Sequence, residues 1–139
     1  MGLFDMFKGS ANEEMTPKLA FGAALLYMMS ADGQIEEEEV GQLISALGGD
    51  RGTLDAALKY ARKNTVDAFL PQAAAVLSEA QKLCILTNLA DSLLADGHAA
   101  AAEQALFNRF LNGFGIAEEQ FRPYFEVIVV KNDRSVFTR

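Results

Sequence analysis

The sequence predicts an all-α protein, a compact bundle of about seven helices built from an internal duplication. Apolar residues recur at helical spacing, and no long segment alternates between apolar and polar residues as a half-buried strand does. Helix start and stop signals follow one another at distances typical of short helices. The sequence also matches itself when it is shifted by 64 residues, so the bundle is expected to contain two similar halves.

The internal match pairs residues 18–60 with residues 82–124 without a gap. Ten positions are identical, and many others exchange one apolar residue for another. The identical positions include an Ala-Asp-Gly triplet and a following Glu in each copy: Ala31-Asp32-Gly33 with Glu39, and Ala95-Asp96-Gly97 with Glu103. We interpret the match as a duplication of one helical unit.

The helices of the first copy follow from their capping residues. Thr16-Pro17 begins a helix that runs to about Met29, because Thr caps a helix and Pro suits its first position. The acidic run 36–39 begins a second helix, since carboxylates favour the positive end of the helix dipole. Gly48-Gly49 ends that helix, and a third covers about residues 53–62.

The remaining helices follow in the same way. A fourth helix begins after Asn64-Thr65, and Pro71 is expected to kink or split it. Residues 78–81 read Ser-Glu-Ala-Gln, a capping box that opens a long helix. Residues 125–130 read FEVIVV, a strand-like composition that we assign to the end of the last helix. Three helices thus complete the bundle, at about residues 78–94, 100–112 and 117–130.

The chain divides into an apolar N-terminal tail, residues 1–15, and a single helical domain, residues 16–139. We expect the tail to dock on the core or on a neighbour; a weak contact of residues 1–8 with a membrane surface is the alternative. No apolar run reaches the length of a transmembrane helix, and the N-terminus lacks a signal-peptide pattern. A cytoplasmic location is therefore expected.

The composition limits the classes of partner and reaction. The formal net charge of −7 argues against nucleic acid, whose phosphates require a basic surface, and leaves cations or a protein partner; a homodimer is one such assembly. The only cysteine, Cys84, lies in the apolar run Leu-Cys-Ile-Leu and is expected to be a buried thiol. No nucleophile, base or phosphate loop is indicated, so no enzymatic activity is expected.

Residues 30–40, read SADGQIEEEEV, match the second half of an EF-hand calcium loop. The first half is missing: Met28 in the first copy and Leu94 in the second occupy positions that require an oxygen ligand. An EF-hand is therefore excluded. Each copy keeps an Asp-Gly turn followed seven residues later by a Glu.

Two interpretations of these Asp/Glu pairs stay open. Their carboxylates suit a hard divalent cation of the Ca²⁺ or Mg²⁺ type, or they only cap a turn and a helix start. If the first helices of the two copies pack antiparallel, Lys82 approaches Asp32 and Lys18 approaches Asp96, and no metal is required. If the Asp-Gly ends meet instead, four carboxylates converge and favour a bound cation.

The duplicated Ala-Asp-Gly…Glu motif, with residues 89–97 (LADSLLADG) and 131–137 (KNDRSVF), resembles the TerB-like tellurite-resistance family. The resemblance implies a helical bundle with paired acidic motifs proposed to bind divalent metal, a role in bacterial stress resistance, and no defined enzymatic activity. It places the metal ligands at four residues, with Asp91 as a further candidate: Asp32, Glu39, Asp96 and Glu103. The second copy departs from the family pattern, because four alanines follow His98 before Glu103. His98 is either an exposed loop residue or an auxiliary ligand.

Overall fold

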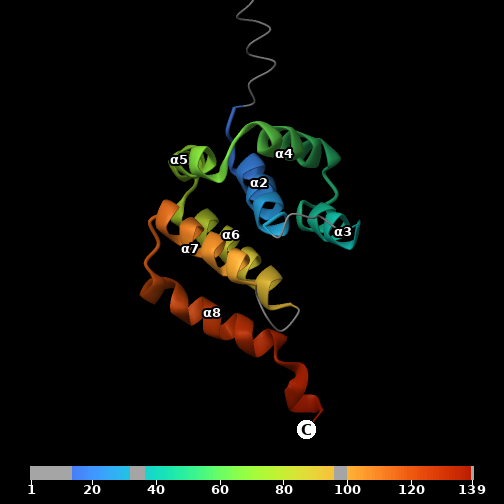
Figure 1. Ribbon diagram of the computed structural model, residues 1–139, viewed down its shortest axis with the longest axis vertical. Helices are drawn as coiled ribbons and strands as arrows, with labels where there is room; N and C mark the ends of the chain where they lie inside the picture. Colours follow the sequence, from blue (N-terminus) through green and yellow to red (C-terminus); the bar gives the residue numbers. More distant parts are fainter. Residues whose placement is uncertain (1–13, 32–36, 96–99, 139) are drawn as a thin grey trace, which may run out of the picture.

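A computed structural model describes residues 14–31, 37–95 and 100–138 of the chain (Figure 1). These residues form seven α-helices and a short 3-10 helix, with no strand among them, which confirms the predicted all-α bundle. The α-helices are α2 (Pro17–Met29), α3 (Glu37–Ala46), α4 (Arg51–Lys63), α5 (Val66–Val76), α6 (Glu79–Leu94), α7 (Ala101–Gly113) and α8 (Glu118–Asn132), and η1 (Arg134–Phe137) follows. Apart from Glu14 and Met15, the expected apolar tail lies outside the described residues.

The helix starts predicted from capping residues are present. The Thr16 hydroxyl accepts a hydrogen bond from the Leu19 amide at 3.1 Å, where Pro17 begins α2. The Ser78 hydroxyl accepts from the Gln81 amide, and the Gln81 side chain accepts from the Ser78 amide, which completes the capping box of α6. Each bond satisfies a backbone donor that the helix itself leaves unpaired.

Two glycines end α3 as predicted. Gly48 and Gly49 have φ values of 69° and 81°, a left-handed conformation that glycine adopts without steric cost. The Gly49 amide donates to the Ile44 carbonyl at 2.8 Å and so satisfies one of the last acceptors of the helix. The chain then turns into α4.

Helix α2 is the centre of the bundle. Nine of its residues are buried, on every side of the helix, because α3, α4, α5, α6 and α7 all pack against it. Around it the chain forms two three-helix halves, α2–α4 and α6–α8 (Figure 1). Shifted by 64 residues, the three helices of the first half fall on residues 81–93, 101–110 and 115–127, which overlap α6, α7 and α8.

Helix α5 fastens the two halves together. Phe69 is completely buried, and its ring lies 5.2 Å from Tyr27 and 6.0 Å from Tyr60 in the first half, centroid to centroid. The same ring lies 6.1 Å from Phe110 of α7 in the second half. Pro71 lies within α5, which continues to Val76, so the helix is not split there.

Helices α2 and α6 run in the same direction (Figure 1). Their N-terminal turns are neighbours, because Pro17 and Lys18 line the same small hollow as Gln81 and Cys84. Both helices therefore end on the same side of the molecule. Cys84 is exposed, and the prediction of a buried thiol is wrong: the buried face of α6 carries the residues after it, beginning with Ile85 and Leu86.

Candidate functional site

The predicted ligands fall partly outside the described residues. Asp32, Asp96 and His98 lie in the segments 32–36 and 96–99, and the Glu39 side chain is likewise not described. What the structure does place is the pair of helix ends that lead into these segments. Because α2 and α6 run in the same direction, both ends lie on one side of the bundle (Figure 1).

The antiparallel alternative is therefore wrong. Lys18 lies beside the N-terminal turns of α6 and pairs with Asp50, which caps α4, at 2.5 Å between Nζ and Oδ2. The hydrogen bonds from Lys18 and Thr53 hold the pKa of Asp50 well below its ordinary value. This pair fastens the start of α2 to the start of α4, at the end of α2 opposite to the one that leads to Asp32.

Glu103 occupies the first turn of α7 and is half-buried. Its carboxylate accepts a hydrogen bond from the Ala100 amide at 3.2 Å. Ala100 has no side-chain acceptor for the amides of the first turn, so the capping bond from a side chain at this helix start comes from Glu103. The bond fixes the direction of the carboxylate at the start of the helix. It is the contact that the structural interpretation of the motif predicts.

Asp91 is bound to helix α8. Its carboxylate accepts from Lys131 Nζ at 3.0 Å and from Asn132 Nδ2 at 2.8 Å. Partial burial raises the pKa of Asp91, but the hydrogen bonds from Asn132 and Lys131 and the charge of Lys131 outweigh it, so the pKa lies below its ordinary value. The carboxylate thus ties α6 to the end of α8 and is already neutralised by the chain.

The residue equivalent to Asp91 in the first half is Tyr27. The Tyr27 hydroxyl donates to the Asn64 carbonyl at the end of α4, at 2.6 Å. Tyr27 and Asp91 therefore do the same work with different chemistry, since each fastens the first helix of its half to the end of the third. Burial, helped by Tyr60, raises the pKa of Tyr27 to about 12.

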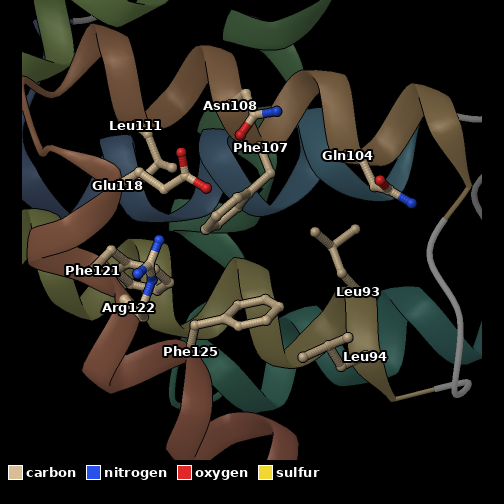
Figure 2. Close-up of a pocket in the computed structure, with 10 residues that line it drawn as sticks. All are labelled: Leu93, Leu94, Gln104, Phe107, Asn108, Leu111, Glu118, Phe121, Arg122 and Phe125. Carbon is tan, nitrogen blue, oxygen red and sulfur yellow. The ribbon is translucent and has the colours of Figure 1, made fainter.

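Within the described part of the chain, no three His, Cys, Asp or Glu side chains lie close enough together to hold a metal ion. An apolar groove of about 460 Å³ lies between α6, α7 and α8 (Figure 2). Its apolar lining consists of Leu93, Leu94, Phe107, Leu111, Phe121 and Phe125. Its polar lining consists of Gln104, Asn108, Glu118 and Arg122.

Side-chain size differs between the two halves at the place where the first helix of each half meets the third. In the first half, a Cβ atom added to Gly22 would lie 3.2 Å from the Ala57 Cβ, so α2 and α4 approach closely. The equivalent positions in the second half are Leu86 and Phe121. The rings of Phe107 and Phe121, with centroids 5.4 Å apart, stand between α7 and α8 (Figure 2).

The groove and the exposed apolar surface of α8 were not predicted from the sequence. The segment FEVIVV could have indicated this surface. A helix that is apolar on all sides is normally buried, so such a segment needs something to cover it. The described residues of α8 bury only Phe121 and Ile128. Five apolar side chains of this helix are exposed instead: Tyr124, Phe125, Val127, Val129 and Val130.

The fold defines a small all-α domain of two similar three-helix halves. The chain matches the family model described as tellurite resistance protein TerB over residues 18–124, and it belongs to this family. The match confirms the resemblance seen in the sequence. No curated protein and no solved structure matches the chain. In the part that the structure describes, no helix is long and apolar enough to cross a membrane.

Proposed function

We propose that this TerB-family chain is a non-catalytic, cytoplasmic stress-response domain that binds one divalent cation of the Ca²⁺ or Mg²⁺ type. The proposed ligands are the Asp/Glu pair of each half: Asp32, Glu39, Asp96 and Glu103. The shared direction of α2 and α6 carries this proposal, because it brings the helix ends before both Asp-Gly turns to one side of the bundle (Figure 1). Four carboxylates at one end of a molecule repel one another, and a cation relieves that repulsion.

The chemistry of the donors fits a hard cation, which prefers carboxylate oxygens. The start of a helix carries partial positive charge and by itself attracts anions, so the carboxylates must supply all the attraction for the ion. Glu103 is suited to this because its hydrogen bond to the Ala100 amide already fixes its direction. We leave Asp91 out of the ligand set, since Lys131 and Asn132 occupy its carboxylate.

Calorimetric titration with a panel of divalent ions tests the proposal. Wild type should bind one or more of the ions saturably, and its melting temperature should rise with the concentration of that ion. The double variant Asp32→Ala/Asp96→Ala should lose both effects. A matched control is Asp55→Ala/Glu119→Ala, which removes two exposed carboxylates elsewhere and changes the net charge equally. No saturable binding below millimolar concentrations, or equal binding by both double variants, would contradict the proposal.

A second candidate function is a helical protein-interaction module in which the acidic motifs are structural caps. The exposed apolar surface of α8 favours it, because Val127 and Val130 are 67% and 76% exposed. Apolar side chains gathered on one element mark sites of protein contact more often than scattered ones. The Glu103–Ala100 hydrogen bond is the kind of contact that a purely structural motif requires.

A further inference from the structure

We infer that α8 is an interface between two copies of this chain, which pair in parallel along the face that carries Val127 and Val130. This inference deepens the second candidate function, since it names the partner of the α8 surface. It does not depend on cation binding. The occupant it commits to is a second copy of the same helix.

Helix α8 carries more apolar side chains than it buries against the rest of the domain. Phe121 and Ile128 lie on one face of the helix, seven residues apart, and are 2% and 3% exposed. Val130 lies on the opposite face, Val127 lies three residues before it on the same exposed side, and the two are the most exposed apolar side chains of the helix. At the position equivalent to Val127, the outer face of α4 carries the exposed Lys63. The outer face of the third helix is therefore apolar only in the second half.

The charges beside this face are complementary to a second copy. Glu126 precedes Val127 on one flank of the face, and Lys131 follows Val130 on the other flank; both are exposed. When two identical helices pair in parallel through such a face, the residue before the first core position meets the residue after the second core position of the partner. Glu126 of each copy then meets Lys131 of the other copy, twice across the interface.

An antiparallel pairing is disfavoured by the same charges. It would set the flank that carries Glu119 and Glu126 against the identical flank of the partner, where like charges repel. Lys131 is available for the parallel contact although it binds Asp91, because its side chain is 62% exposed. An ammonium group has three donors, and Asp91 takes two of them.

The size of the face predicts a reversible dimer. Helix α8 has 15 residues and is about 22 Å long, too short to bury the roughly 800 Å² per partner of a stable complex by itself. The exposed Val136 and Phe137 of η1 add apolar surface directly after it. We therefore expect association that depends on concentration rather than a permanent dimer.

Sedimentation velocity from micromolar to millimolar concentration tests the interface on the full chain. The wild-type mass should rise from one copy to two, and Val127→Asp should remain a single copy over the whole range. The matched control is Val76→Asp, the same substitution at a 38% exposed position of α5, which should associate like wild type. Circular dichroism serves to check that each variant is folded. A wild type that stays monomeric, or a Val127→Asp variant that still associates, would overturn the inference.

A charge exchange tests the parallel orientation. Glu126→Lys and Lys131→Glu should each weaken self-association, because both create like-charged pairs in a parallel dimer. Mixing the two variants should restore association, since one copy then carries two lysines and the other two glutamates at these positions. Lys131→Glu also removes the ion pair with Asp91, so circular dichroism must first show that both variants are folded. If two folded variants associate no better in the mixture than alone, the parallel arrangement is wrong. Cation binding by Val127→Asp should equal that of wild type, so failure of the dimer and failure of the cation site are separate results.

Discussion

The two halves of this protein use one plan with different side chains. In the first half, Gly22 and Ala57 let α2 and α4 approach closely, and the outer face of α4 is charged. In the second half, Leu86 and Phe121 take those positions, a groove opens between α6, α7 and α8, and α8 exposes apolar residues. The comparison teaches that the Asp/Glu motif is present in both halves of the sequence, whereas the third helix exposes a set of apolar side chains in the second half.

The largest effect is expected from Phe121→Ala. Phe121 is 2% exposed, and its ring lies 5.4 Å from Phe107 and 5.9 Å from Tyr124. Removing it leaves a cavity at the base of the groove and should lower the free energy of unfolding by about 3–5 kcal/mol, measured by urea denaturation. Phe125→Ala is the control, because Phe125 is 39% exposed and should lose about 1 kcal/mol. Equal losses would show that Phe121 does not hold the second half together.

Placing the phenylalanine of the second half at the equivalent position of the first half should also lower the stability of the fold. Ala57→Phe introduces a ring where Gly22 and Ala57 are in close contact, and should lower the free energy of unfolding by about 3 kcal/mol through overpacking. The half-buried Ala61, which is equivalent to Phe125, provides the control Ala61→Phe, with an expected loss of about 1 kcal/mol. If Ala57→Phe is tolerated without loss, close packing is not what distinguishes the first half.

The hydrogen bonds of Asp91 to α8 and of Tyr27 to α4, here called the two tethers, should lose their contribution to stability at opposite ends of the pH scale. Asp91→Asn and Tyr27→Phe should each cost about 1 kcal/mol near neutral pH, by loss of the hydrogen bonds to α8 and α4. Because the folded pKa of Asp91 is lowered, its stabilisation is present above its ordinary value of 3.8 and is lost as the pH falls through the folded value. The difference in stability between wild type and Asp91→Asn should therefore shrink in acid.

The contribution of Tyr27 to stability depends on pH in the opposite direction. Its pKa is raised from 10.0 to about 12, so its stabilisation is complete below pH 10.0 and falls as the pH rises toward about 12. The difference between wild type and Tyr27→Phe should stay constant in acid and shrink in alkali. Thermal unfolding of both pairs across the pH range measures these differences. A Tyr27→Phe difference that shrinks in acid would show that the two tethers do not work separately.

The smallest effect on stability is expected at Glu103. Glu103→Gln keeps an oxygen that accepts from the Ala100 amide, so stability should change by less than about 0.5 kcal/mol. Glu103→Ala loses the bond and should cost about 1 kcal/mol. Both variants should bind the cation more weakly, because each removes one carboxylate charge. Unchanged cation affinity in Glu103→Gln would leave Glu103 with a capping role alone.

The sequence predicted the helices well because their ends are set locally. Thr16, Ser78 and the pair Gly48-Gly49 act on backbone groups within a few residues, so their effect is readable without the fold. Cys84 shows the limit of such reasoning. Its apolar neighbours suggested burial, but which face of α6 meets the core depends on α2, α7 and α8.

The candidate site was predictable only in part for the same reason. Repetition identified the Asp/Glu pairs, but the direction of α2 relative to α6 is a tertiary property that the spacing of residues does not contain. The groove is lined by residues of α6, α7 and α8, which are brought together only by the packing of three helices. The tether of Asp91 to Lys131 joins residues 40 positions apart, which no local pattern indicates.

The most direct test of the central claim is the stoichiometry of cation binding in wild type, Asp32→Ala and Asp96→Ala, measured by calorimetry. If the two halves share one ion, wild type binds one cation per chain, each single variant binds that one cation more weakly, and Asp32→Ala/Asp96→Ala loses the binding. If each half holds its own ion, wild type binds two cations per chain and each single variant still binds one. If neither half holds an ion, no variant differs from wild type. Either of these results would contradict a site shared by the two halves.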